Sequence, residues 1–130
     1  MGFLKNLWDT SEPKETKILP WISLTDVKQL HLIPERSNTK IQIIFKYSTR
    51  CGFNRIMLNR FIDAYDFSEV EADLYYLDII NYRKISNAVA HKFQVLHESP
   101  QVLVIKNGGV VANQSHGNIN HLDLKAFIGD

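Results

Sequence analysis

The chain has 130 residues, of which 45% are hydrophobic and 22% are charged, and its formal net charge is +1. This length suits one domain, and the small charge argues against a protein that binds nucleic acid or a membrane surface through a basic excess. No apolar run approaches the ~18–20 residues of a membrane-spanning helix. The first residues lack the long apolar centre of a signal peptide, so we expect a cytoplasmic protein.

The first part of the chain predicts a loose segment followed by a helix and a strand. Residues 1–18 are mixed and charged, and we expect a loosely ordered segment there, with one domain at 19–130. Ser23 is a candidate N-cap of a short helix that Pro34 ends. Residues 40–47 form a nearly continuous apolar run rich in β-branched residues, which is typical of a central strand covered on both faces.

The middle of the chain predicts a β-α-β unit. Phe53, Met57 and Phe61 recur at helical spacing, so a helix should begin near Cys51. A second strand is expected at 72–80, parallel to the first and joined to it by a right-handed crossover. Another helix follows at about 82–93.

The last part predicts a β-hairpin and a closing helix. Strands are expected at 102–105 and 110–113, with a tight turn at 107–109, because Asn-Gly between two β-rich runs favours a hairpin. A helix should cover 118–130, with its apolar residues Leu124, Phe127 and Ile128 facing the core. The predicted fold class is α/β, a central mixed β-sheet flanked by helices, and the order of elements is similar to that of thioredoxin-like folds.

The single cysteine, Cys51, lies where a strand passes into a helix. Ligands of α/β folds bind at the carboxyl ends of such strands. The free N–H groups and the dipole of a helix N-terminus stabilise a thiolate, and Arg50, between Thr49 and Cys51, adds positive charge. Gly52 follows. A thiolate here can attack a disulfide, whereas the alternative is an unreactive cysteine that fills the core.

Two further stretches are candidates for substrate binding. Pro100 precedes the first hairpin strand, where thioredoxin-like folds hold a cis-proline beside the reactive cysteine, and Ser99 would offer its backbone to an extended substrate. A proline that opens a strand is also ordinary. Gly117 and Asn118 precede the predicted last helix, whose N–H groups can hold the carboxylate of a small thiol or can simply belong to a helix cap.

Two other kinds of site are weaker candidates. The five histidines lack the spacing of a metal site, and one cysteine cannot form an internal disulfide or fill a zinc site by itself, so we expect no metal. A hydrolase that pairs Cys51 with His97 or His116 would require a positioned base, and the chain is short for a papain-like enzyme.

Three stretches resemble the monothiol bacilliredoxins, the bacillithiol-system redox proteins of the YtxJ type. They are KYSTRCG, SNAVAHKFQVLHESPQVLVIKNGGVV and SHGNI, and the resemblance covers roughly residues 19–128. It places the reactive cysteine of the family on Cys51 and its cis-proline on Pro100. Many members have proline after the cysteine, whereas this chain has Gly52, which keeps an N–H near the sulfur and loosens the first helical turn.

The resemblance implies a monothiol disulfide oxidoreductase with no tightly bound cofactor. Its co-substrate would be bacillithiol, its partners would be S-thiolated client proteins, and an external thiol would release the cap from Cys51. Two alternatives stay open. One is a non-catalytic thioredoxin-like module that holds a peptide along Ser99 and Pro100, and the other is a glutaredoxin-like reductase that uses a different small thiol.

Overall fold

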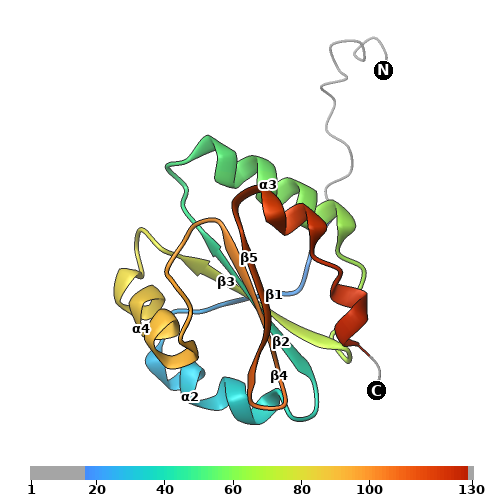
Figure 1. Cartoon of the computed structure of the whole chain (residues 1–130). Helices are drawn as coiled ribbons and strands as arrows, with labels where there is room; N and C mark the ends of the chain where they lie inside the picture. The colour runs from blue at the N-terminus through green and yellow to red at the C-terminus, as the bar shows by residue number, and fades with distance from the viewer. Residues whose placement is uncertain (1–16, 129–130) are drawn as a thin grey trace.

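The computed structural model describes residues 17–128, which form a five-stranded mixed sheet with helices on both faces (Figure 1). The strands are β1 (Trp21–Ser23), β2 (Ile41–Tyr47), β3 (Ala72–Asp78), β4 (Gln101–Lys106) and β5 (Gly109–Ser115), in the sheet order β1-β3-β2-β4-β5. The helices are α2 (Val27–Arg36), α3 (Gly52–Ala64) and α4 (Arg83–Phe93), and two 3-10 helices follow, η1 (His116–His121) and η2 (Leu124–Phe127). The predicted α/β class with a central mixed sheet is confirmed.

The central strand is β2, and all of its residues are buried. It pairs in parallel with β3, as the predicted β-α-β unit requires, and antiparallel with β4. Phe45 packs in the core cluster that includes residues of α3, whereas Ile44 packs in the cluster that includes residues of α2 and α4. Figure 1 shows α3 and the C-terminal 3-10 helices over one face of the sheet, with α2 and α4 over the other. The chain therefore reaches Cys51 from a strand that is fixed on both edges and both faces.

The first helix begins later than the sequence predicts. Ser23 is the last residue of β1 and pairs with Tyr76 of β3, so it is not the N-cap. Asp26 is the N-cap instead, and its backbone N–H donates to the Gln29 side chain at 3.0 Å in a capping box. The prediction that Ser23 caps the helix failed because Ser23 pairs with β3 instead. A strand of three residues has no sequence pattern that would reveal this pairing.

The prediction that Pro34 ends this helix is also wrong. Helix α2 passes through Pro34 and ends at Arg36. Pro34 lies in the last turn, where it removes one backbone hydrogen bond of the helix without ending it, and Ser37 fixes the end of the helix. The Ser37 N–H donates to the Ile33 carbonyl at 2.9 Å, and its hydroxyl donates to the Pro34 carbonyl at 2.5 Å.

The predicted hairpin of β4 and β5 is confirmed. Asn107 and Gly108 form its turn with φ angles of 52° and 90°, in the left-handed region that these residue types favour. The N–H groups of both residues donate to Ser37, at 2.9 Å to its carbonyl and at 2.8 Å to its hydroxyl. The turn is thus held against the end of α2.

The expected closing helix over 118–130 is wrong. The chain forms the two short 3-10 helices η1 and η2, and Leu122 between them is extended. The Asp123 side chain accepts from the N–H of Lys125 and starts η2 as a separate turn. The three apolar residues expected to face the core do so and are partly buried against it: Leu124, Phe127 and Ile128.

The expected loose segment 1–18 lies outside the described residues, apart from the exposed Lys17 and Ile18. Its order stays a prediction. Within residues 17–128, no helix is long and apolar enough to cross a membrane.

Candidate active site

Cys51 is the N-cap residue of α3, and it is exposed. Three residues, 48–50, separate it from the end of β2. The predicted junction of strand and helix is therefore confirmed, and the alternative of a cysteine that fills the core is wrong. An exposed thiol at this place can meet a disulfide from solvent.

Hydrogen bonds from α3 lower the pKa of the Cys51 thiol from its ordinary value of 9.0. The backbone N–H of Asn54 contributes most and that of Phe53 follows, while the Asn54 side chain adds a smaller contribution and partial desolvation opposes them. The two backbone N–H groups belong to the first turn of α3, as the position of Cys51 predicts. The thiolate fraction at neutral pH rises accordingly.

Asn54 connects Cys51 to the rest of the site, and the sequence analysis missed it. Its side chain is buried, and its Oδ1 accepts from the Ser48 N–H at 2.8 Å and from the Ser99 hydroxyl at 2.6 Å. Asn54 stands three residues after Cys51, where a Cys-X-X-Cys motif has its second cysteine. This spacing was the feature of the sequence that could have identified Asn54 as a site residue. Because Asn54 stands where a second, resolving cysteine would be, Cys51 is the one thiol of the site.

Pro100 directly precedes β4, which pairs with β2, the strand that leads to Cys51. The Ser99–Pro100 peptide bond is cis, and Pro100 is buried directly before β4. Asn54 joins the two parts of the site, because it helps to lower the pKa of Cys51 and its side chain accepts from the Ser99 hydroxyl. The Pro100 carbonyl accepts from the His116 N–H at 2.9 Å, which ties this segment to the start of η1.

The other residues predicted around the thiol make fewer contacts. Thr49 and Arg50 are exposed, and the backbone N–H of Arg50 donates to the Ser48 hydroxyl at 3.3 Å. Arg50 is not among the groups that shift the pKa of Cys51. The charge contribution predicted for Arg50 therefore does not explain the lowered pKa, which comes from hydrogen bonds.

Gly52 is the first residue of α3 and is exposed. A Cβ atom built on it would have no neighbour within 4 Å, and its φ is not in the left-handed region. A side chain would fit here, so neither space nor backbone conformation requires glycine. Because the donors to Cys51 are Phe53 and Asn54, the N–H of Gly52 is not part of this stabilisation.

Gly117 and Asn118 follow His116, whose backbone N–H donates to the Pro100 carbonyl. Both are exposed, and both belong to the 3-10 helix η1. The dipole argument for them does not apply, because the long helix that they were expected to precede is absent. The neighbouring His116 has its Nε2 atom 4.0 Å from Glu98, whose carboxylate also accepts from the Ser115 hydroxyl. Their role in binding a small thiol stays a prediction.

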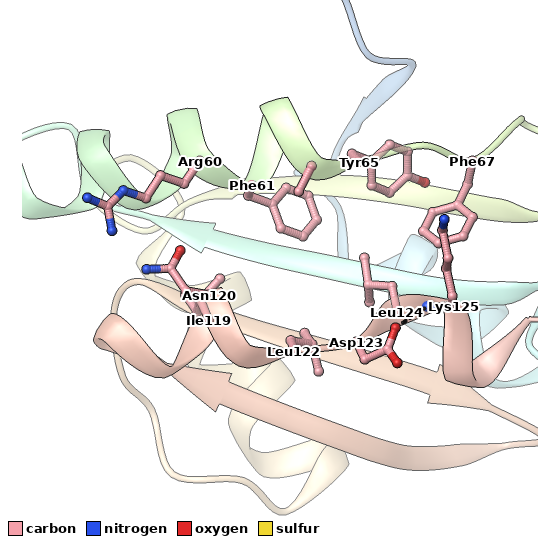
Figure 2. A pocket seen from close by; sticks show the side chains of 11 residues that line it. Arg60, Phe61, Tyr65, Phe67, Ile119, Asn120, Leu122, Asp123, Leu124 and Lys125 are labelled. Carbon is pink, nitrogen blue, oxygen red and sulfur yellow. Dashed lines mark hydrogen bonds between the residues drawn. The ribbon is translucent and has the colours of Figure 1, made fainter.

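A separate pocket of about 240 Å³ lies at the other end of α3 (Figure 2). Phe61, Tyr65 and Phe67 form its upper wall, and residues of η1 and η2 form its floor. None of the predicted site residues lines it, and it contains no thiol. The chemistry of Cys51 therefore takes place elsewhere, on an open surface. Among residues 17–128, no group of three or more His, Cys, Asp or Glu side chains is arranged to hold a metal ion.

A mixed sheet with this topology, a cysteine at the N-terminus of α3 and a cis-proline before β4 define a thioredoxin-like thiol oxidoreductase. The family model of the monothiol bacilliredoxin BrxC matches residues 22–124, which is most of the chain. The protein therefore belongs to the monothiol bacilliredoxin family, and the resemblance found in the sequence is confirmed.

Solved structures agree with this assignment. A structure described as a candidate oxidoreductase with a thioredoxin fold is 31% identical, with a TM-score of 0.63, and the match covers 82% of this chain and 91% of that chain. Thioredoxin from Trypanosoma brucei brucei is 18% identical, with a TM-score of 0.62 over 82% of this chain and 87% of its own. Thioredoxin from Schistosoma mansoni is 20% identical, with a TM-score of 0.56 over 83% and 92%. The two thioredoxins show the fold alone.

Proposed function

We propose that the protein removes bacillithiol from mixed disulfides on client proteins, with Cys51 as the nucleophile. The observation that carries this proposal is an exposed Cys51 with a lowered pKa, linked through Asn54 to the segment of Ser99 and Pro100, in a chain of the monothiol bacilliredoxin family. A lowered pKa raises the fraction of thiolate at a given pH, and thiolate is the form that attacks disulfides.

The reaction takes two thiol–disulfide exchanges. In the first, the Cys51 thiolate attacks the bacillithiol sulfur of the client mixed disulfide, a bond forms between these two sulfurs, and the client leaves as a thiolate. In the second, an external thiolate, either bacillithiol or a reductant, attacks the bacillithiol sulfur of the disulfide on Cys51. Cys51 leaves as a thiolate, and the cap departs as a disulfide with the attacking thiol. The second thiol must be external, because the chain has one cysteine.

Each site residue has a role in this scheme. The N–H groups of Phe53 and Asn54 stabilise the attacking and departing sulfur of Cys51. The backbone of Ser99, next to Pro100, aligns the incoming client chain. The exposed residues Arg50, Gly117 and Asn118 border this surface and are the groups proposed to contact the acidic small thiol.

The test is release of a free client thiol from a protein that carries one bacillithiol mixed disulfide, with bacillithiol as the resolving thiol. We expect release by the wild type and none by C51S. Because Cys51 is exposed, C51S should keep the unfolding free energy within about 0.5 kcal/mol of the wild type. A C51S variant that unfolds would instead mean that Cys51 serves the core.

Other outcomes would select the alternatives. Equal release from a glutathionylated client would leave a disulfide oxidoreductase but contradict the choice of bacillithiol. No release from either client, with Cys51 fully reduced, would support a non-catalytic module that binds peptides along Ser99 and Pro100.

A further inference from the structure

Lys46 is a charged residue in the interior of the sheet. It lies in β2, and its relative exposure is 0%. Within residues 17–128, no carboxylate forms an ion pair with its ammonium group. Burial, and then the charge of Arg83, lower its pKa to about 8. A lysine in this state destabilises the fold compared with an apolar residue, so its presence suggests a role in function.

The ammonium of Lys46 contacts two groups near the end of the sheet that carries the active site. Its Nζ atom lies 3.4 Å from the Ser86 carbonyl of α4 and 3.3 Å from Nδ1 of His97. The Ser86 hydroxyl also lies 3.0 Å from this Nδ1 atom. An ammonium group can only donate, so Nδ1 accepts and the neutral imidazole carries its proton on Nε2. Lys46 and Ser86 together fix the position of the His97 ring.

His97 belongs to the segment that leads to the candidate substrate-binding residues. The successive residues of this segment are held by different parts of the fold. The Leu96 carbonyl accepts from the Gln101 side chain at 2.8 Å. Ser99 donates to the side chain of Asn54, and between these two anchors His97 is held by Lys46. Removal of the lysine contact would free the ring that lies two residues before Ser99.

Lys46 does not act on the thiol directly. The groups that shift the pKa of Cys51 are Phe53 and Asn54, and Lys46 is not among them. Its side chain is fully buried, so it cannot touch a ligand in solution. The remaining route from Lys46 to the active site is through His97 and the segment that follows it.

We propose that Lys46 is a positioning residue for protein substrates, which holds His97 and thereby fixes the backbone of Ser99 and Pro100 where the client chain binds. This proposal rests on the proposed function. A client protein needs an ordered backbone at Ser99, because its chain binds there in an extended conformation. Bacillithiol disulfide is too small to pair with this backbone in that way. Loss of Lys46 should therefore affect client proteins more than the small disulfide.

The test compares K46M and H97F with the wild type in two assays. For a bacillithiolated client, each variant should lower kcat/KM by roughly tenfold, the size expected when a hydrogen bond to a charged group is lost. The rate at which bacillithiol disulfide forms an adduct on Cys51, and the pKa of that thiol, should stay unchanged. The double variant K46M/H97F should have the same kcat/KM for the client as either single variant, because both substitutions remove the same contact between Lys46 and His97.

Two further variants and a second measurement complete the test. H97N keeps an acceptor near the position of Nδ1 and should restore most of the client activity. K40M is the matched control, since Lys40 directly precedes β2, at the end of the strand opposite to Lys46, and pairs with Asp73 at 3.1 Å. Hydrogen exchange of the backbone at 96–99 should be faster in K46M and H97F than in the wild type, and unchanged in K40M.

If the amides at 96–99 exchanged in K46M at the wild-type rate, the proposal would be overturned. It would also be overturned if K46M lost activity equally toward the client and toward bacillithiol disulfide. Faster exchange over the whole domain would also overturn it, because that would show a general structural role. Failure of the wild type to act on the client would contradict the proposed function instead. The exchange rates at 96–99 would then decide alone whether Lys46 holds this segment.

Discussion

At the scale of single residues, the candidate nucleophile Cys51 is stabilised by hydrogen bonds rather than by a neighbouring charge. The donors are the backbone N–H groups of Phe53 and Asn54 and the Asn54 side chain. Asn54 also accepts from Ser48 and Ser99, so one buried amide fixes the strand end, the thiol and the substrate segment together. A buried oxygen that accepts two hydrogen bonds makes the local geometry specific.

The role of Asn54 predicts the direction of change in two variants. In N54A the thiol loses the side-chain donor but keeps both backbone donors, so the pKa of Cys51 should rise part of the way toward its ordinary value of 9.0. In N54D a carboxylate replaces the donor and repels the thiolate, so the pKa should rise further. The pH dependence of alkylation by iodoacetamide measures both. A pKa in N54A equal to that of the wild type would contradict the role of the side chain.

The lowered pKa of Lys46 predicts a pH dependence of stability. The folded state loses this proton near pH 8, whereas the unfolded state keeps it until near the ordinary lysine value of 10.5. Between these values the unfolded state binds more protons, so this group makes folding more favourable as the pH rises. K46M lacks the proton and should be more stable than the wild type at pH 7, with a difference that shrinks toward pH 10.

Urea unfolding of the wild type and K46M over this pH range checks the prediction, with K40M as the control. A constant difference between the wild type and K46M at all pH values would contradict it. The expected gain in global stability is opposite to the expected loss of local protection at 96–99, so the two effects of K46M can be separated.

The sequence made some of these residues predictable and others not. Cys51 and Pro100 could be found, because each stands at a recognisable junction between a predicted strand and its neighbour. Asn54 was missed, since a polar residue in the first turn of a helix usually faces solvent and only its spacing from Cys51 marked it. Lys46 was predictable in part, because a strand covered on both faces must bury its lysine, but the contact with His97 depends on packing of α4 that the sequence does not reveal.

At the scale of elements, the N-terminus of α3 is the part of the fold that creates the reactive thiol. Cys51 has extended backbone angles, with φ −114° and ψ 118°, and the helix begins at Gly52. Extended angles suit a residue that precedes proline, and the first position of a helix favours proline. The family's usual residue would therefore fit this backbone, although the chain has glycine.

This geometry predicts that G52P is stabilising, by about 0.4–1 kcal/mol, because proline reduces the freedom of the unfolded chain. The pKa of Cys51 should stay unchanged, because its donors are Phe53 and Asn54. Denaturant unfolding and iodoacetamide alkylation test the two statements, and G52A is the control that adds a side chain without fixing φ. A destabilised G52P, or a shifted thiol pKa, would show that the N–H of Gly52 is needed.

Elements with a strong hydrophobic period were predictable, and short ones were not. A nearly continuous apolar run identified β2, the helical period identified α3 and α4, and Asn-Gly identified the hairpin. Strand β1 was missed because its three residues are defined by pairing with β3 rather than by a pattern of their own. The C-terminal helix was wrong because its apolar residues reach the core from two 3-10 turns, an arrangement that gives a similar spacing.

At the scale of the whole molecule, the fold brings three distant stretches to one end of the sheet. Residues 48–54 supply the thiol and its donors, residues 96–101 supply the substrate segment, and residues 115–118 border it through the bond from His116 to Pro100. The sequence predicted this meeting only through its resemblance to a known fold, because the Ser99 and Asn54 side chains, which join two of the stretches, are 45 positions apart. The open surface suits a large client better than a small substrate enclosed in a pocket.

The most direct test of this account is the intact mass of the purified protein after mixing with bacillithiol disulfide, measured over a range of pH. We predict one bacillithiol adduct, on Cys51, that still forms readily below the ordinary thiol pKa, and little adduct with glutathione disulfide under the same conditions. If the reduced protein forms no adduct with bacillithiol disulfide at any pH, the central claim that Cys51 is the nucleophile of a bacilliredoxin is wrong.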